Sequence, residues 1–554
     1  MYSKPHERAN KETLINTLIW AFFCLAIVYA VFVVARFWWY VEIEMLAGDV
    51  IGGVFPRYLK GSGFYELTHH NYAQSLIQFA MLWADIYIGP YPFWTRSFAY
   101  LSWFVFFLTL RSSGVQPQSN VLVSATLLIW FSYKNSASLY TYPWVHVEVG
   151  CQLLSLSAAI GAVKTINSGR TILIIFLTSL CFLFSHVHKG FYFPLVLGWL
   201  AVFISQPKAQ RYAFFFLSVF YLIYIVWADG FLMGFYKEAG TNPFPVDWWS
   251  RAVATSALST AVIGSVAQQF GTGLQLYFFR GAVFLGGLYI IVACLWRVVW
   301  LRDSRAALPL IFLLPALGMT FTTVIGRLSL MGLEQLQYGE RYWYYSVLFS
   351  LGILLFLREY CAALLSKVAL AFYLVCGLVL AAVSPTNQNY QISYVYRMNA
   401  LQIARAVNPD IRWVYQWYTP ELVTGYFLSR DELKSLSAEV FGWRGFDLVK
   451  HDFEPGISPL PECDVSDLKD VSVDLGGEPA RMVELELPSY HQSTFAIAWS
   501  NNDIVSMSYV LKMTPQTLIM YMPTNLTTNI VLYQVQSTQN LKEICKVSLN
   551  PADL

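Results

Sequence analysis

Long apolar blocks, separated by short polar segments, fill the first two thirds of the chain. The blocks are roughly 15 to 24 residues long, enough for a helix to cross about 30 Å of hydrocarbon. The first block, residues 15–40, is too long for a signal-peptide core and has no small-residue cleavage site, so we interpret it as an uncleaved span. With it we expect about eleven spans. The other ten are predicted at residues 97–110, 118–133, 147–163, 171–187, 191–206, 211–227, 278–296, 307–325, 342–357 and 367–384.

The distribution of lysine and arginine predicts the orientation of these spans. Residues 1–12 are polar and basic, and the positive-inside rule therefore places the N-terminus in the cytoplasm. An odd number of spans then puts the long loop 41–75 and the segment 385–554 together on the outer side. The loops expected inside are marked by Arg111, Lys164, Arg170, Lys208, Arg211, Arg297, Arg302, Arg305, Arg358 and Lys367.

Two apolar stretches do not fit this scheme as spans. If Arg111 is inside, residues 75–88 cannot cross the membrane fully, and residues 252–277 contain scattered serines and glutamines. We expect both stretches to form helices that lie on the outer interface or dip into it.

After Pro385 the chain becomes more polar and richer in turn residues, and no apolar run is long enough to span. Helices are predicted at residues 394–406 and 430–440, the second from the capping-box pattern Ser429-x-x-Glu432. Alternating or β-branched runs then predict a small β-rich domain. Cys463 and Cys545 lie in this region and could pair in an oxidising compartment. The strand-like runs are residues 482–487, 495–499, 506–513, 517–522 and 529–535.

Composition supports the membrane class. The 554 residues are 56% hydrophobic and 13% charged, whereas soluble domains have about 25% charged residues. A single soluble core of this size is excluded, because cores stop growing near about 250–300 residues. The net charge of +2 gives no reason to expect a nucleic-acid partner. We therefore predict a polytopic α-helical membrane protein with a transmembrane domain at 13–384 and an extracytoplasmic, mixed, β-rich domain at 385–554.

Ionisable residues gather on the predicted outer side. Several sit at span ends, where burying a charge is costly and usually functional. Carboxylates can take a proton from a nucleophile, and cations can hold a phosphate and stabilise it as a leaving group. Both kinds on one face suggest transfer of a group from a phosphate-bearing lipid. The residues are Asp49, Arg57, Lys60, Glu66, His69, His70, Lys134, His146, Glu148, His186, His188, Lys189, Asp229, Asp247, Arg251, Arg327, Glu334, Glu340 and Arg341.

Short motifs follow the first span in a distinctive order. The outer loop carries Gly48-Asp49-Val50, then Gly61-Ser62-Gly63, then His70-Asn71-Tyr72 before an apolar stretch. Gly339-Glu340-Arg341-Tyr342 stands at the outer start of a late span. This layout resembles the GT-C superfamily of polyprenyl-phosphate-sugar-dependent membrane glycosyltransferases, over residues 13–384. The resemblance implies that this transmembrane domain is catalytic.

The resemblance implies that Asp49 is the general base that deprotonates the acceptor hydroxyl, so that attack on the anomeric carbon expels polyprenyl phosphate with inversion. Independently, Asp49 lies about ten residues past a span, beside glycines that allow close approach of the backbone. Glu42 and Glu44, nearer the membrane edge, stay open as alternatives. Many members carry a second acid beside the loop aspartate, whereas Val50 follows here. We therefore predict no metal ligands and leave a divalent cofactor open.

Glu148 is the second predicted catalytic carboxylate. It stands at the outer start of a span, where it would orient the acceptor or share a metal; the alternative is a helix N-terminal acid favoured by the macrodipole. Arg341 is the leading phosphate ligand, because guanidinium pairs bidentately with phosphate; interfacial snorkelling is the alternative. The predicted substrate- and phosphate-binding residues are Arg57, His69, His70, Tyr72, His188, Lys189, Arg251, Arg327, Arg341 and Tyr342.

The sequence therefore predicts an integral membrane glycosyltransferase that works on the outer face, among membrane lipids. It would move a sugar from a polyprenyl-phosphate carrier to a lipid-linked glycan or another extracytoplasmic acceptor. A bacterial inner membrane with a periplasmic C-terminal domain is the expected home, and O-antigen glucosyltransferases match in size and layout. One alternative is an O-antigen polymerase or ligase, although the late loop 326–341 is short for that class. The other is a transporter or flippase, a class that tends to show internal repeats and charges near the midplane.

Overall fold

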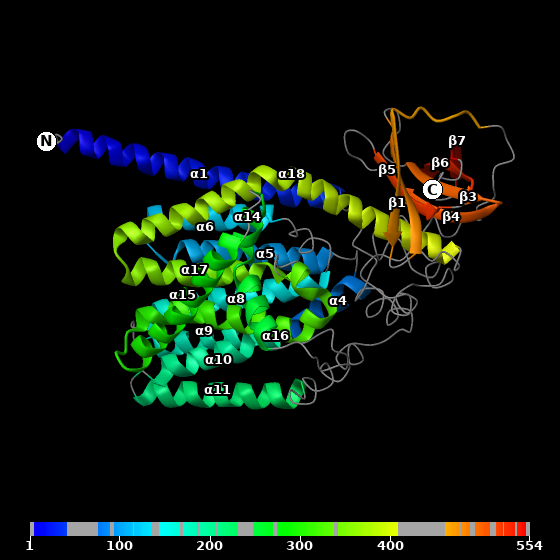
Figure 1. The fold of residues 1–554 in the computed structure, drawn as a ribbon. Helices are drawn as coiled ribbons and strands as arrows, with labels where there is room; N and C mark the ends of the chain where they lie inside the picture. The colour runs from blue at the N-terminus through cyan, green and yellow to red at the C-terminus, as the bar shows by residue number, and fades with distance from the viewer. Residues whose placement is uncertain are drawn as a thin grey trace.

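The computed structural model shows a bundle of helices with a β-rich region at one end (Figure 1). The structure describes residues 5–40, 76–88, 93–114, 116–133, 143–166, 170–185, 188–204, 206, 208–229, 248–269, 274–336, 342–407, 460–475, 478–487, 494–509, 517–524, 526–537 and 540–549.

Helices make up the described chain as far as residue 407. A helix lies at each of the predicted spans. The α-helices are α1 (Pro5–Tyr40), α4 (Leu76–Tyr87), α5 (Phe93–Arg111), α6 (Gln116–Ser132), α8 (Pro143–Thr165), α9 (Thr171–Ser185), α10 (Lys189–Ile204), α11 (Lys208–Asp229), α13 (Trp248–Ser259), α14 (Ala261–Gln268), α15 (Leu274–Val299), α16 (Ala307–Leu336), α17 (Tyr344–Tyr360) and α18 (Ala363–Val407).

Five stretches of the described helices are long and apolar enough to cross a membrane. The chain is therefore an α-helical membrane protein with several spans, and the total of about eleven stays a prediction. The helices α9 and α10 are also apolar but shorter. The five stretches are Thr13–Arg36, Val147–Thr165, Tyr277–Val299, Ser304–Gly326 and Ala363–Pro385.

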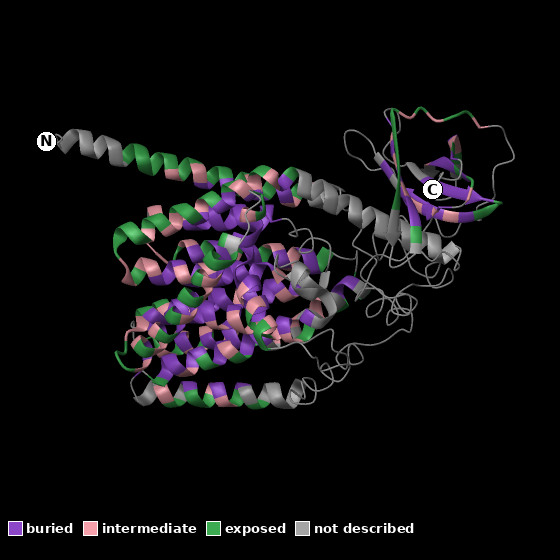
Figure 2. Ribbon diagram, in the orientation of Figure 1, coloured by how far each residue is buried: buried purple, intermediate pink, exposed green. Residues whose placement is uncertain are grey.

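Burial separates central helices from peripheral ones (Figure 2). The apolar stretches of α8 and α16 are mostly buried inside the bundle, whereas those of α1, α15 and α18 are mostly exposed. Large apolar side chains on the exposed helices, such as Phe32 of α1 and Phe278 of α15, point out of the bundle. In a membrane these faces meet acyl chains, so their exposure is expected rather than anomalous.

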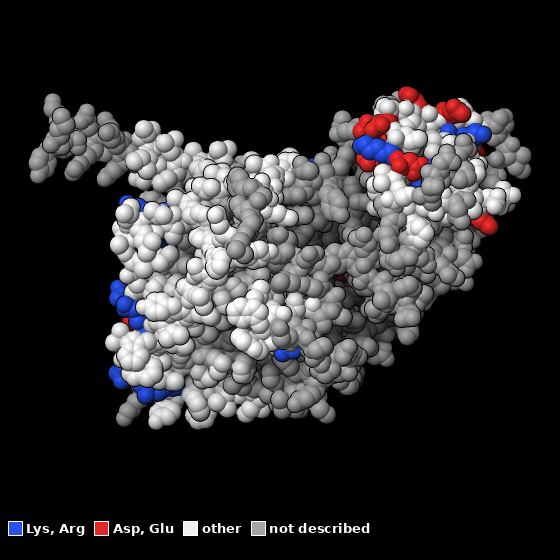
Figure 3. All heavy atoms as spheres, in the orientation of Figure 1, with Lys and Arg blue, Asp and Glu red and all other residues white. Residues whose placement is uncertain are grey.

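Lysines and arginines gather at the end of the bundle away from the β-rich region (Figure 3). This distribution matches the loops that the positive-inside rule predicts to face the cytoplasm. The inner-loop residues of the prediction whose side chains the structure describes are Arg111, Lys164, Arg170, Arg211, Arg297, Arg302, Arg305, Arg358 and Lys367.

Residues 252–277 do not form one interfacial helix, and this prediction is corrected. They belong to α13, α14 and the start of α15, and α14 is largely buried. The scattered polar residues bond inside the protein: the hydroxyl of Ser265 donates to Tyr133 Oη (2.7 Å), and Ser346 Oγ accepts from the Val262 N–H (3.1 Å). At the break between α13 and α14, the Arg280 guanidinium donates from Nε to Thr260 Oγ1 (3.1 Å) and from Nη2 to the Ala257 carbonyl.

The last span does not end at the predicted boundary. One helix, α18, runs from Ala363 to Val407 and passes through Pro385. At about 1.5 Å per residue its 45 residues are more than twice as long as the hydrocarbon is thick. The change in composition at Pro385 therefore does not end the helix. The end of α18 at Val407 leads to the β-rich region, and α18 contacts β4 (Asp503–Tyr509) (Figure 1).

The β-rich region consists of two antiparallel sheets that enclose a common apolar core. One sheet has the strand order β1-β2-β5 and the other has the order β4-β3-β6-β7. Asn501 and Asn502 both have positive φ (49° and 69°), as a two-residue hairpin turn requires between β3 and β4. The remaining strands are β1 (Asp467–Leu475), β2 (Glu478–Glu486), β3 (Thr494–Ser500), β5 (Thr517–Pro523), β6 (Thr528–Ser537) and β7 (Asn540–Leu549).

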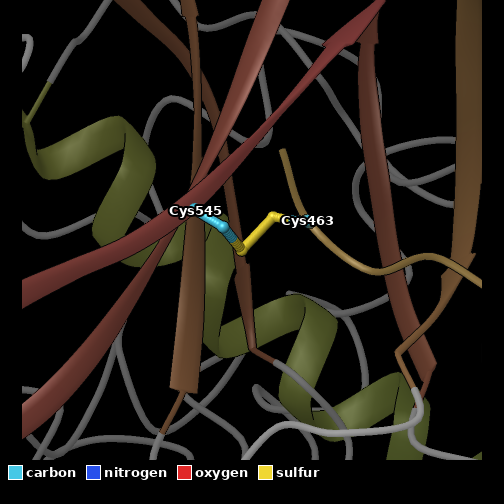
Figure 4. Close-up of a disulfide and its surroundings, with 2 residues drawn as sticks. All are labelled: Cys463 and Cys545. Carbon is cyan, nitrogen blue, oxygen red and sulfur yellow. A yellow bond between two sulfur atoms is a disulfide. The ribbon is translucent and has the colours of Figure 1, made fainter. Parts of the chain in front are cut away.

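A disulfide joins Cys463 to Cys545 (Figure 4), as the sequence allowed. It ties the segment before β1 to strand β7. Two backbone bonds reinforce the link: the Cys463 N–H donates to the Lys546 carbonyl and the Lys546 N–H donates to the Pro461 carbonyl, both at 3.0 Å. A disulfide here is consistent with an extracytoplasmic location.

Two glycines let α10 and α16 pack with their backbones in contact. A Cβ on Gly190 would lie 2.6 Å from the Gly318 carbonyl oxygen, and a Cβ on Gly318 would meet the Gly190 carbonyl and the Pro194 ring. We expect Gly318→Ala to lower the free energy of unfolding by about 1–3 kcal/mol, because the helices must move apart. The measurement is the thermal unfolding midpoint of the purified protein in detergent.

Gly286 of α15 provides the matched control, since a Cβ there would meet no atom within 4 Å. Gly286→Ala should leave stability unchanged or raise it by up to about 1 kcal/mol, through the higher helix propensity of alanine. Equal midpoints for Gly318→Ala and Gly286→Ala would contradict the close packing of α10 on α16.

Candidate functional site

Three helices bring the candidate site together at one end of the bundle. Glu148 lies in the second turn of α8, His188 directly precedes α10, and Tyr344 opens α17. Only two residues separate α17 from α18, so the two helices run in opposite directions. The start of α17 therefore lies at the end of the bundle toward which α18 leaves for the β-rich region, as Figure 1 shows.

The Glu148 carboxylate is half-buried and is held by two neighbouring side chains. The Gln152 amide donates from Nε2 to Glu148 Oε1 over 3.2 Å, and the Tyr344 hydroxyl donates to the same oxygen over 3.4 Å. Gln152 lies one helical turn after Glu148, so both side chains share a face of α8. Tyr344 comes from 196 positions along the chain. The carboxylate is thus oriented both from its own helix and from α17.

Aromatic side chains continue from Tyr344 to His188. The ring centroids of Tyr344 and Tyr345 lie 4.5 Å apart in an edge-to-face arrangement, and the ring of Tyr345 lies 6.1 Å from that of His188. His188 Nδ1 accepts a hydrogen bond from the Gly190 N–H (3.1 Å), so Nε2 carries the proton of the neutral ring. We call Glu148, Gln152, His188, Tyr342, Tyr344 and Tyr345 the outer cluster.

The outer cluster offers groups suited to a hydroxyl-rich ligand. Glu148 is an acceptor, the Nε2–H of His188 is a donor, and both side chains are partly accessible. The Gln152 amide oxygen is buried and accepts no hydrogen bond from any residue that the structure describes. Sugar hydroxyls can use both donors and acceptors. A carboxylate fixed by two hydrogen bonds is also placed to orient such a hydroxyl for reaction.

The structure brings together three of the predicted site residues, Glu148, His188 and Tyr342. The ring of Tyr342 lies 5.8 Å from that of Tyr345. Arg251 is half-buried in α13, where its backbone carbonyl accepts a hydrogen bond from Thr255 Oγ1. Lys189 begins α10 and Arg327 lies in α16, but their side chains fall outside the described part of the structure. The other candidates lie outside the described residues: Glu42, Glu44, Asp49, Arg57, His69, His70, Tyr72 and Arg341.

Gln152, Tyr344 and Tyr345 were not predicted as site residues. A glutamine inside an apolar run, one turn after Glu148, is the signal that points to Gln152. Trp343, between Tyr342 and Tyr344, stands at a predicted span end, where aromatic residues commonly form an interfacial belt, but its position differs. Trp343 is fully buried and stacks on Tyr133 with ring centroids 4.6 Å apart. The aromatic run at residues 342–345 therefore forms part of the bundle core and of the outer cluster.

A buried carboxylate lies on α4, the helix that packs against the start of α8. Asp85, near the end of α4, accepts from the backbone N–H of Trp94 (2.6 Å) and of Thr95 (3.1 Å), and so caps the start of α5. Burial raises the pKa of Asp85 to about 7, against the opposing effect of these hydrogen bonds and of Arg96. Apolar side chains of α4 pack against the start of α8, next to Glu148.

The raised pKa of Asp85 predicts a pH dependence of stability. The folded protein binds more protons than the unfolded chain between about pH 4 and about pH 7, so this contribution to the free energy of unfolding falls as pH rises through that window. We expect the wild-type protein to lose more thermal stability than Asp85→Asn between about pH 5 and about pH 8. Parallel losses in the two proteins would rule out titration of Asp85 as the cause.

Among the residues that the structure describes, no three or more histidines, cysteines or acids are grouped as a metal site. Comparison with known proteins adds no assignment, since no protein family, curated protein or solved structure matches this chain.

Proposed function

We propose that this protein is an integral membrane glycosyltransferase that transfers a sugar from a polyprenyl-phosphate carrier to an acceptor on the outer side of the membrane. The observation that carries the proposal is the placement of Glu148. This carboxylate is half-buried and accepts hydrogen bonds from an amide and a phenolic hydroxyl, at the end of the bundle opposite the basic loops. In the sequence, acids and cations on the predicted outer face already suggested transfer of a group from a phosphate-bearing lipid.

The proposed reaction exchanges one bond to the anomeric carbon for another. The acceptor hydroxyl oxygen attacks that carbon, and the bond from the carbon to the phosphate oxygen breaks. Asp49, the predicted base, takes the hydroxyl proton, and polyprenyl phosphate leaves with the bonding electron pair. The cations predicted to hold the leaving phosphate are Arg57, Lys189, Arg251, Arg327 and Arg341, with His69, His70 and Tyr72 as further ligands.

Glu148 is proposed to act on the acceptor. Its carboxylate would accept a hydrogen bond from a sugar hydroxyl, while Tyr344 and Gln152 hold that carboxylate in place. His188, whose Nδ1 accepts from the Gly190 N–H, is proposed to donate from Nε2–H to a sugar or phosphate oxygen. The ring of Tyr342 packs beside that of Tyr345 in the outer cluster. This arrangement orients the acceptor without requiring a metal ion; a divalent cofactor stays open.

The proposed location is a bacterial inner membrane, with the β-rich region in the periplasm and the acceptor a lipid-linked O-antigen or another cell-surface glycan. Several apolar helices and a disulfide in the β-rich region support an outer location for that region. Because α18 carries the β-rich region from the same end of the bundle as the outer cluster, an extracytoplasmic glycan could meet both.

The test of the class uses the purified full-length protein in liposomes with a radiolabelled polyprenyl-phosphate hexose. If the protein is a glycosyltransferase, the labelled donor is consumed and label appears in an added lipid-linked glycan. The rate of labelling rises in proportion to the amount of protein. A polymerase or ligase would instead require a diphosphate-linked donor. Movement of an intact lipid between leaflets, with no donor consumed, would replace the proposal with a flippase.

A further inference from the structure

Two cationic side chains donate hydrogen bonds to a short turn at the basic end of the bundle. Residues Ser112, Ser113 and Gly114, here called the inner turn, follow α5 and precede α6. Lys164 Nζ donates to the Ser112 carbonyl and to Ser112 Oγ (3.1 Å), and Arg358 Nη2 donates to the Ser113 carbonyl over 3.1 Å. These contacts bring the ends of α8 and α17 to the same turn.

The charges at the inner turn are not balanced by the carboxylates in contact with it. In the described structure, Arg358 contacts Glu359 (3.4 Å), whereas Lys164 makes its described hydrogen bonds to uncharged oxygens. The start of α6 also faces the turn, and the N-terminus of a helix carries free N–H groups and a partial positive charge. The inner turn is therefore a site of surplus positive charge.

Two hydrogen-bond donors at the inner turn have no acceptor among the residues that the structure describes. Arg358 Nη1 and the hydroxyl of Ser119 are buried and make no hydrogen bond with any residue that the structure describes. Both groups lie against Gly114, because a Cβ on this residue would lie 2.9 Å from Ser119 Oγ and 2.9 Å from the central carbon of the Arg358 guanidinium. Both groups can donate, so the chemistry that would satisfy them is an anionic oxygen.

We propose that the inner turn binds a phosphate group, with Arg358 and Ser119 donating to its oxygens and Lys164 supplying a second charge. A planar guanidinium and a mobile ammonium are complementary ligands for phosphate. Lys164 is exposed, so the group can arrive from the surface. The phosphate belongs either to the headgroup of an anionic phospholipid in the inner leaflet or to a soluble phosphate ester.

This site is separate from the outer cluster. Glu148 and Lys164 lie 16 residues apart on α8, which corresponds to about 24 Å along the helix. Tyr344 and Arg358 are at the two ends of α17 in the same way. The proposal therefore does not depend on a glycosyl transfer reaction.

The experiment uses the full chain in nanodiscs of phosphatidylcholine and follows the thermal unfolding midpoint. One arm adds phosphatidylglycerol in increasing fraction, and the other adds inorganic phosphate to discs of phosphatidylcholine alone. We expect saturable stabilisation of the wild-type protein in one arm, which also identifies the source of the phosphate. The apparent affinity should fall about tenfold in Arg358→Gln and in Lys164→Gln.

Two further variants keep the test decisive. Ser119→Ala removes one donor while keeping size and helix, and should weaken binding even if Arg358→Gln fails to fold. Arg170→Gln removes an exposed charge at the same end of the bundle, away from the described contacts of the inner turn, and should bind as the wild type does. The proposal is overturned if neither arm stabilises the wild type, or if Arg170→Gln weakens binding as much as the inner-turn variants.

Discussion

Glu148→Gln should lower sugar transfer about 100-fold with little change in stability. The substituted amide keeps an oxygen that can accept from the Tyr344 hydroxyl and the Gln152 amide, so the arrangement around it persists. The negative charge that holds the acceptor hydroxyl is lost, and misplacing a reacting group costs on the order of 100-fold in rate. The measurement is the initial rate of label transfer from polyprenyl-phosphate hexose in proteoliposomes.

Two further variants serve as comparisons for Glu148→Gln. Tyr344→Phe removes the hydroxyl that donates to Glu148 and should lower transfer less, by about tenfold, because the charge remains. Glu484→Gln changes a carboxylate of β2 that lies 3.9 Å from Lys469, and should transfer at the wild-type rate. Full activity of a correctly inserted Glu148→Gln protein would reduce Glu148 to a structural acid at a helix start.

Loss of the Cys463–Cys545 disulfide should destabilise the β-rich region by about 2–5 kcal/mol. The bond closes a loop of 82 residues, which contains strands β1 to β6. Cys545 is also buried in the core between the sheets, so the link constrains the unfolded chain and fixes the position of β7. We expect Cys545→Ser to lower the unfolding midpoint, and reductant to have the same effect on the wild-type protein.

Cys361→Ser is the control for the disulfide, because Cys361 is half-buried at the end of α17 and is not paired. It should unfold as the wild type does in the absence of reductant. Alkylation of the non-reduced, membrane-isolated protein followed by mass measurement checks the bond directly. If Cys463 and Cys545 both react with the alkylating reagent, the disulfide is absent and the case for an oxidising compartment is lost.

The sequence predicted the helices well because a long apolar run has one stable form in a membrane. Each predicted span coincides with a helix, and strands β2 to β6 lie at runs with alternating or β-branched residues. It missed β1 and β7 as strands. β1 is an exposed edge of its sheet, so it lacks a buried face that would impose alternation, and Leu468 and Val471 both remain exposed.

Other errors came from treating membrane boundaries as structural boundaries. Pro385 marks a change from apolar to polar composition, but α18 continues through it, since a proline costs one backbone hydrogen bond and bends a helix without always ending it. The polar residues of α14 indicated an interface, yet Ser265 and the backbone of Val262 bond inside the bundle. A polar residue in an apolar stretch needs a hydrogen-bond partner, and that partner can be another helix as well as water at the interface.

The candidate site could be predicted in part. Glu148 was identified because a carboxylate at a span end is costly, and His188 and Tyr342 because they lie on the same predicted face. The contact of Glu148 with Tyr344 could not be predicted, since it joins residues 196 positions apart and depends on how α8 and α17 pack. Local pattern identifies ionisable residues at helix ends, whereas tertiary packing decides which of them meet.

The measurement that tests the central claim most directly is sugar transfer by Asp49→Asn beside the wild type, with expression and membrane insertion confirmed for both. Asparagine preserves size and polarity but cannot accept the hydroxyl proton. We predict that transfer from polyprenyl-phosphate sugar falls by about 100-fold or more, as expected for a lost general base. Unchanged transfer would assign the base to Glu42, Glu44 or Glu148. No transfer by the wild type from any polyprenyl-phosphate sugar would contradict the account and favour a transporter.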